Sequence, residues 1–339
     1  MKTNNLKIGT HYNRLTTIIP VDLGFRALDI LRKTINICKT NEKLGGSVVI
    51  GLADRRTLID KIFISLARQF KRTIVVNVPT TGAVNTALLR NRAFEKAATE
   101  FLLILDADIW PDFELFNKYQ RNIELGLAPF YFIPCMYLSA YGSKALLRDG
   151  DPEGMTEKYF NFSRKEFVHL ANPSSITIMR SIDFINAGSF NEAFEGHGYE
   201  DFDFMLRLAV HYNVLTPCGK LLDTCNARSP LFPSGFRRAL GRLCLPTLLE
   251  KDMAFHLFHP TPKNKSYHAS RRSNLEIFKS LHGHLESSLP ESRTLIEDFI
   301  GLCQKHDLNL RDYSALFEDK PGHIDRYDTF RRRLRFLFK

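Results

Sequence analysis

The sequence predicts an α/β fold with a mainly parallel sheet and helices on both of its faces. Two observations predict it. Nearly continuous apolar runs rich in β-branched residues, typical of strands buried on both faces, recur between residues 15 and 108. Between them lie segments whose apolar residues recur at helical spacing. Alternation of this kind is typical of parallel strands joined by crossover helices.

The first strand is predicted at residues 15–21 (LTTIIPV), and the first helix follows at 25–38. Further strands are predicted at 46–54, 72–78 and 100–108, with helices at 60–70 and 86–98 between them. Ligands bind beyond the carboxyl ends of the strands in such sheets, so the polar residues there are the first candidates for a site. They are Asp54, Asn77 and the turn from Asp106 to Asp108.

The pattern weakens from residue 112 to 170, which reads as aromatic-rich and turn-rich sequence, with a loop at RDGDPEG, residues 148–154. A strand is predicted at 174–181, and an amphipathic helix follows the Gly-bearing segment that begins at Gly196. Residues 274–319 read as helical. We therefore expect a main domain at 1–262 and a C-terminal helical extension at 263–339 that ends in a basic amphipathic tail.

Composition excludes disorder and fibrous repeats, because 44% of the 339 residues are hydrophobic and 25% are charged. The net charge of +10 favours a polyanionic partner, which can be a nucleotide, a nucleic acid or an acidic membrane face. The tail at 328–339 carries five cationic side chains against one acid and alternates them with bulky apolar residues. It is expected to lie on an anionic membrane; a solvated helix end or a docking strip for a partner enzyme are the alternatives.

The six cysteines form no C-x-x-C pair, which argues against a zinc ribbon and a disulfide framework and favours a reducing compartment. The first 20 residues lack the apolar core of a signal peptide, and no uncharged run reaches the roughly 20 residues of a spanning helix. We expect a cytoplasmic protein that is peripheral on the inner face of the membrane if the tail binds there.

Three groups of residues carry chemistry. Asp106 and Asp108 leave a buried strand, where they either hold a divalent cation against a diphosphate or cap a turn. Glu200, Asp201 and Asp203 open a helix after a Gly-rich segment, where acids complement the helix dipole or bind hydroxyls with one acid as base. A similar D-x-D at 149/151 reads as a solvated turn.

His256 and His259 form the third group, within the segment FHLFHP. Both imidazoles can face one ligand if this segment is helical or turned, whereas a buried, hydrogen-bonded histidine is the ordinary alternative for each. The two imidazoles with two distant aspartates make a mixed nitrogen and oxygen site, which suits Mn²⁺ better than a thiolate-rich zinc site does.

Over residues 14–262 the sequence resembles GT-A glycosyltransferases in five features that occur in the expected order. They are the IIPV strand, Asp54, the segment RNRAFEKAATEFLLILDADIWP, the segment NAGSFNEAFEGHGYEDFDFMLRL and HLFHP. The resemblance is to family 2 enzymes of bacterial capsule and surface polysaccharide synthesis, with a β4-galactosyltransferase-like acceptor motif. It implies a GT-A catalytic domain at 1–262 and an inverting, metal-dependent hexosyltransferase. The implied partners are a UDP-sugar donor and a saccharide or lipid-linked saccharide acceptor.

The resemblance also implies roles for single residues. Asp54 would contact the nucleobase, Arg90 and Asn91 would lie near the nucleotide, and Asp106 and Asp108 would meet ribose and metal. Glu200 would bind the acceptor sugar, and Asp201 would be the catalytic base. Asp108 with His256 or His259 would hold Mn²⁺ or Mg²⁺.

The alternative from another class is a nucleic-acid-binding protein or a metal-dependent nuclease, which also uses basic patches and paired acids. Against it, the excess of cations over acids lies mainly after residue 230, and no recognised nucleic-acid-binding signature occurs. We therefore expect no nucleic acid among the partners.

Overall fold

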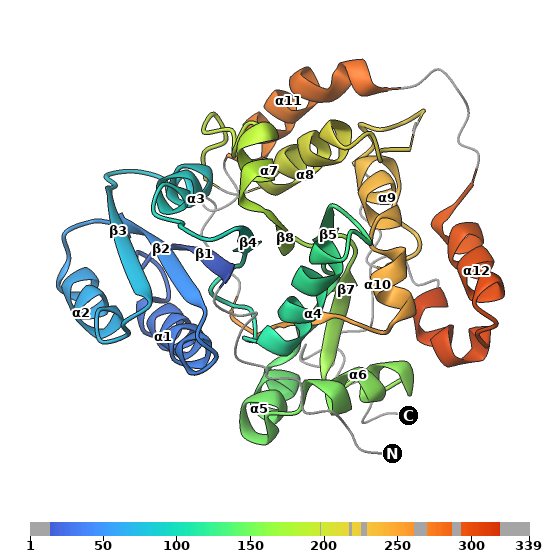
Figure 1. The fold of residues 1–339 in the computed structure, drawn as a ribbon, viewed down its shortest axis with the longest axis horizontal. Helices are drawn as coiled ribbons and strands as arrows, with labels where there is room; N and C mark the ends of the chain where they lie inside the picture. The colour runs from blue at the N-terminus through green and yellow to red at the C-terminus, as the bar shows by residue number, and fades with distance from the viewer. Residues whose placement is uncertain are drawn as a thin grey trace, which may run out of the picture. The chain divides into compact units, whose positions relative to one another are not determined.

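The computed structural model describes residues 14–196, 198–216, 219–224, 229–260, 270–286 and 293–318 (Figure 1). Up to residue 132 its elements are β1 (Leu15–Val21), α1 (Ala27–Lys43), β2 (Ser47–Asp54), α2 (Leu58–Ala67), β3 (Thr73–Pro79), α3 (Thr86–Phe94), β4 (Phe101–Ile104), α4 (Phe113–Glu124) and β5 (Phe130–Phe132). Then follow β6 (Cys135–Leu138), α5 (Ala140–Asp149), α6 (Pro152–Phe160), β7 (Phe167–Ala171), β8 (Thr177–Arg180), α7 (Ser181–Asn186) and α8 (Glu200–His211). The last are α9 (Gly235–Arg242), α10 (Leu245–Leu249), β9 (Ala254–His256), α11 (Arg271–His282), the 3-10 helix η4 (Gly283–Leu285), α12 (Leu295–Lys305) and the 3-10 helix η5 (Leu310–Phe317).

The chain forms two compact units, and each of them is assembled from three segments. The first unit takes its described residues from 1–131, 175–212 and 263–278, and the second from 132–174, 213–262 and 279–339. One of its points of division, between residues 262 and 263, coincides with the boundary that the sequence indicates, but neither unit is continuous in the chain. That boundary stays a proposal.

The first unit contains a six-stranded sheet in the order β3-β2-β1-β4-β8-β5. The neighbouring pairs among β3, β2, β1 and β4 are parallel, and β8 runs antiparallel to β4. The strand order reverses direction after β3, so right-handed crossovers place α1 and α2 on one face and α3 on the other. Figure 1 shows α3 across β1–β3 from α1 and α2. This confirms the predicted fold class, and the crevice where ligands bind is expected at the carboxyl ends of β1 and β4.

A glycine lets α3 approach this sheet closely. A Cβ on Gly51 of β2 would lie 2.1 Å from the carbonyl oxygen of Leu89 on α3, which is closer than two nonbonded atoms can come. Leu89 is 1% exposed, and the next residue, Arg90, is 2% exposed. The missing side chain of Gly51 therefore seats α3, and with it Arg90, against the sheet.

The prediction for residues 112–170 was wrong, because this stretch contains α4, α5, α6 and three short strands. The strands β5, β6 and β7 have three, four and five residues, too short for a clear apolar run. At RDGDPEG, Asp149 ends α5, Gly150 has φ 65° and Asp151 caps α6, so the expected loop is a tight junction between two helices.

The second unit contains a three-stranded sheet in the order β7-β6-β9, with β6 antiparallel to β7 and parallel to β9. The same unit also contains α5, α6, α9, α10 and α12. None of the helices in the described part of the chain is long and apolar enough to cross a membrane.

Candidate active site

A buried arginine joins the two acidic motifs of the first unit. The guanidinium of Arg90 donates from Nη2 to Oδ1 of Asp106 at 2.9 Å and from Nη1 to Oδ1 of Asp201 at 2.7 Å. It also lies over the ring of Phe190, 4.8 Å from the ring centroid. Asp106 and Asp201 are far apart in the sequence, and the structure brings both carboxylates onto one cation.

The charge of Arg90 is maintained by its surroundings. Burial lowers the pKa of a guanidinium, but the charges of Asp201, Asp106 and Glu200 outweigh that effect, and the pKa of Arg90 is raised above its ordinary value. Removing the cation would leave the carboxylates of Asp106 and Asp201 without the counter-ion that they share. Arg90 is therefore as much a structural element of this site as a candidate ligand for the nucleotide.

A second cluster surrounds Asp108. Oδ2 of Asp108 accepts from Nη2 of Arg26 at 2.9 Å, and Oδ1 accepts from Nζ of Lys33 at 2.6 Å. Lys33 also donates to Asp29 at 3.0 Å. Burial lowers the pKa of Arg26, but its hydrogen bond to Asp108 and the charges of Asp108 and Asp29 raise it overall. Asp108 thus sits among cations at the carboxyl end of β4.

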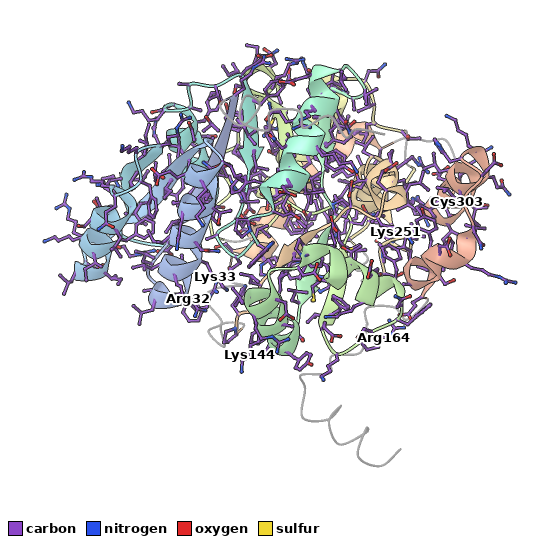
Figure 2. All side chains as sticks on the ribbon, turned by 60° about the horizontal axis from the view of Figure 1, so that its bottom comes forward. Arg32, Lys33, Lys144, Arg164, Lys251 and Cys303 are labelled. Carbon is purple, nitrogen blue, oxygen red and sulfur yellow. The ribbon has the colours of Figure 1, made fainter. Side chains whose placement is uncertain are left out.

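Sequence reasoning did not find Arg26 and Lys33. A signal for Lys33 exists, because it shares the buried face of α1 with Ile30 and Ile37, at helical spacing. Arg32 and Lys33, both labelled in Figure 2, show the contrast on α1: the side chain of Arg32 is 72% exposed and that of Lys33 is 6% exposed. A lysine on an apolar stripe indicates a partner across the core, which here is Asp108.

The three acids of α8 have different surroundings. Glu200 is 4% exposed; its Oε1 accepts from the hydroxyl of Thr86 at 3.0 Å and its Oε2 from the backbone N–H of Gly198 at 2.9 Å. Asp203 is buried and paired with Arg207. The side chain of Asp201 is 27% exposed and meets Arg90. Among the three, Asp201 therefore best combines access to solvent with a fixed position.

Two other predicted residues are held by local contacts. The amide of Asn91 donates to the backbone oxygen of Phe190 at 2.9 Å and accepts from the N–H of Phe190 at 3.0 Å, which fixes the loop after α7. Oδ1 of Asp54, at the end of β2, accepts from the N–H of Arg56 at 2.8 Å. Asn77 lies within β3, opposite Leu52. The nucleotide contacts expected of Asp54 and Asn91 stay predictions.

The histidine pair lies in the second unit. His256 ends β9, so the pair stands at a strand end rather than on a helix. The rings of His256 and His259 are 5.3 Å apart, centroid to centroid. Tyr137 of β6 stacks on His256 at 4.2 Å and, on its other side, on His169 of β7 at 4.3 Å. His169 and Tyr137 were not singled out from the sequence, because a cross-strand ladder follows from register alone.

Sequence similarity identifies the family of the chain. Residues 60–282 match the model of the family described as "Glycosyltransferase like family 2". The chain belongs to this family. The matched region contains Arg90, Asp106, Asp108, Asp201 and both histidines, and it ends at the last residue of α11. A comparison of the chain with the curated proteins found no match.

Solved structures resemble the chain only distantly. TarS of S. aureus in complex with UDP is 16% identical over 57% of this chain and 55% of that chain, with a TM-score of 0.38. The catalytic domain of Drosophila β1,4-galactosyltransferase 7 with xylobiose is 15% identical over 58% of this chain and 61% of that one, with a TM-score of 0.31. Glucosyl-3-phosphoglycerate synthase from Mycobacterium tuberculosis, with Mn²⁺, UDP and glucosyl-3-phosphoglycerate, is 12% identical over 86% and 88%, with a TM-score of 0.38. The chain thus spans little more than half of TarS 1–349.

Replacing Arg90 by methionine is expected to lower the free energy of unfolding by about 2 kcal/mol or more, because it leaves Asp106 and Asp201 without their shared cation. Denaturant unfolding measures the effect. Arg92→Met is the matched control on the same helix: Arg92 is 49% exposed and pairs with Glu95 at the surface, so its replacement is expected to change the free energy of unfolding much less. Equal losses in the two variants would contradict the role given to Arg90.

Proposed function

We propose that this family 2 glycosyltransferase is an inverting, metal-dependent hexosyltransferase that moves a sugar from a UDP-sugar to a saccharide or lipid-linked saccharide acceptor. The proposed setting is capsule or surface polysaccharide synthesis. One observation carries the proposal: Arg90 binds both the aspartate expected at the donor and the aspartate expected to serve as base. Family membership favours this activity over the nucleic-acid alternative.

Asp201 has the chemistry that the acceptor side needs. The ion pair with Arg90 holds the carboxylate of Asp201 in one place. An aspartate cannot fully deprotonate an alcohol before the reaction, so the proton moves to Asp201 while the acceptor oxygen bonds to the anomeric carbon. The bond from that carbon to the diphosphate oxygen breaks on the opposite side, and UDP leaves with the electron pair. In-line displacement with one base inverts the configuration.

On the donor side we propose that Asp54, Arg90, Asn91, Asp106 and Asp108 bind the nucleotide, as the family resemblance implies. The charges at the carboxyl end of β4 support this assignment. Arg26 and Lys33 contact Asp108 there, and a diphosphate is a stronger anionic partner for a guanidinium and an ammonium than a single carboxylate is. When a donor binds, these two cations can pass from Asp108 to the phosphate oxygens.

The residues present fit a divalent cation in their chemistry. Asp108 supplies carboxylate oxygen, His256 and His259 supply imidazole nitrogen, and a set of this kind suits Mn²⁺ or Mg²⁺ better than it suits a structural zinc. The stacking of Tyr137 on His256 restrains the plane of that imidazole, as the neighbours of metal-binding histidines generally do. We propose Asp108, His256 and His259 as the ligands; a cation bound there would neutralise charge on the departing diphosphate.

Asp201→Asn is expected to lower sugar transfer by about 10²- to 10⁴-fold, because the amide cannot accept the proton, while UDP binding is unchanged. A panel of UDP-sugars with candidate saccharide acceptors measures transfer, and calorimetry measures UDP affinity. Asp149→Asn is the control, since Asp149 belongs to the other D-x-D and pairs with Arg148 at the surface. Loss of UDP binding together with transfer would count against Asp201 as the base.

Asp108→Asn is expected to weaken Mn²⁺ binding in the presence of UDP by about tenfold or more, because the neutral amide is a poorer ligand for a hard cation. Titration calorimetry measures the affinity directly, independently of turnover. His256→Ala and His259→Ala, tested separately, show which imidazole binds. Unchanged affinity in all three variants would exclude the proposed ligand set.

The basic tail at 328–339 lies outside the described residues. We propose that it holds a cytoplasmic enzyme against the inner face of the membrane, because it alternates cationic and bulky apolar residues. Deleting residues 329–339 is expected to abolish salt-sensitive cosedimentation with vesicles that contain anionic lipid. Binding that survives the deletion would locate the membrane contact elsewhere.

A further inference from the structure

The first half of α11 belongs with the predicted acceptor site rather than with a separate extension. Residues 271–278 of this helix fall in the first unit, together with 175–212. They contact the acceptor loop, by which we mean Glu195, Gly196, Gly198 and Tyr199, the described residues directly before α8. We propose that Asn274 is a positioning residue that holds this loop in the conformation that binds the acceptor. The inference rests on the proposed function.

Asn274 closes the loop with a single side-chain amide. It is 2% exposed, and its Nδ2 donates to the backbone oxygen of Glu195 at 2.9 Å and to that of Gly198 at 3.0 Å. An NH₂ group has two hydrogens, so these bonds use its whole donor capacity. The two carbonyls stand on either side of the glycine turn, and Asn274 therefore fixes the distance between its ends.

The loop needs such support because its backbone is strained. Gly196, Gly198 and Tyr199 have φ of 72°, 105° and 75°. Glycine adopts these angles freely, but a tyrosine in the left-handed region costs of order 1 kcal/mol or more and persists only where its surroundings hold it. Tyr199 is buried, and its ring lies 5.5 Å from that of Phe278, centroid to centroid. The guanidinium of Arg271 lies 5.9 Å from the centroid of the Tyr199 ring.

These three contacts come from one face of α11. Arg271, Asn274 and Phe278 are three and four residues apart, which places them one above the other on a helix. On its other side the loop is tied to the residues that lead into α3, because the N–H of Gly196 donates to the oxygen of Val84 at 2.9 Å. The loop is thus held by two segments that are distant in sequence.

The shape of the loop determines where the proposed reacting groups lie. Tyr199 is the N-cap residue of α8, whose first two residues are Glu200 and Asp201, and Gly198 donates its N–H to Glu200 at 2.9 Å. A change in the glycine turn would therefore displace the carboxylates expected to bind and deprotonate the acceptor. Arg90 does not depend on α11 for its contact with Asp106. Asn274 should accordingly affect the acceptor and leave the donor unaffected.

The test compares Asn274→Asp and Asn274→Ala with the wild type and with Arg272→Ala, a control at an exposed position of the same helix. The carboxylate of the first variant repels both carbonyls, and the second variant removes both bonds. Losing two buried hydrogen bonds is expected to raise the acceptor KM about tenfold or more. The donor KM and UDP affinity should not change. Amide hydrogen exchange at Gly198 and Tyr199 should become faster, without a change in β1 or β2.

Three outcomes would overturn the inference: an unchanged acceptor KM, a donor KM that rises in parallel with it, or unchanged exchange in the loop. If Asn274→Asp does not fold, Phe278→Leu tests the same face of α11 with a milder change and the same readouts. Failure of the proposed function gives a different result: the wild type would transfer no sugar, or Asp201→Asn would transfer it as well as the wild type does, while the exchange effect of Asn274 remained.

Discussion

The buried guanidinium of Arg90 is the interaction on which the first unit's site depends. A cation that is 2% exposed is stable only if carboxylates compensate for its lost hydration, and Asp106 and Asp201 do so from two motifs that are far apart in the chain. The dependence is mutual, because the planar guanidinium of Arg90 also fixes the positions of both carboxylates. The ion pairs with Arg90 therefore hold two acidic motifs next to each other although they are far apart in the chain.

Charge compensation extends along the carboxyl ends of the strands. Asp22, directly after β1, pairs with Arg55 at 3.0 Å, and Asp108, after β4, is bound by Arg26 and Lys33. Each pair places cations at the edge where a parallel sheet binds its ligands. Such an edge suits a diphosphate, which can replace a carboxylate partner without leaving a cation uncompensated.

The loop before α8 shows a different principle, in which packing holds a strained backbone conformation in place. Tyr199 has a positive φ and is stabilised by Phe278, while Asn274 ties the ends of the glycine turn. The two residues of α11 lie more than 70 positions after the loop that they support. A loop built in this way can be rigid in the folded protein although its sequence is rich in glycine.

Local pattern was sufficient for the strands and helices up to residue 108, because long apolar runs and helical spacing are properties of neighbouring residues. It failed from 112 to 170, where strands of three to five residues are defined only by their partners across the sheet. It also identified Asp106 and Asp201 but not their contact with Arg90, and His256 but not the stack with Tyr137 and His169. Those contacts depend on register and crossover, which bring distant segments together.

The amino-acid sequence by itself determined the α/β class, the positions of the first strands along the chain and the polar residues that follow them. These features depend only on side-chain polarity and on the spacing of neighbouring residues. Only the tertiary structure decided which charge neutralises which, since ion pairs such as that between Arg90 and Asp201 join residues 111 positions apart. It also decided that α11 supports the acceptor loop, because burial of Asn274 and Phe278 requires a surface that no local pattern describes.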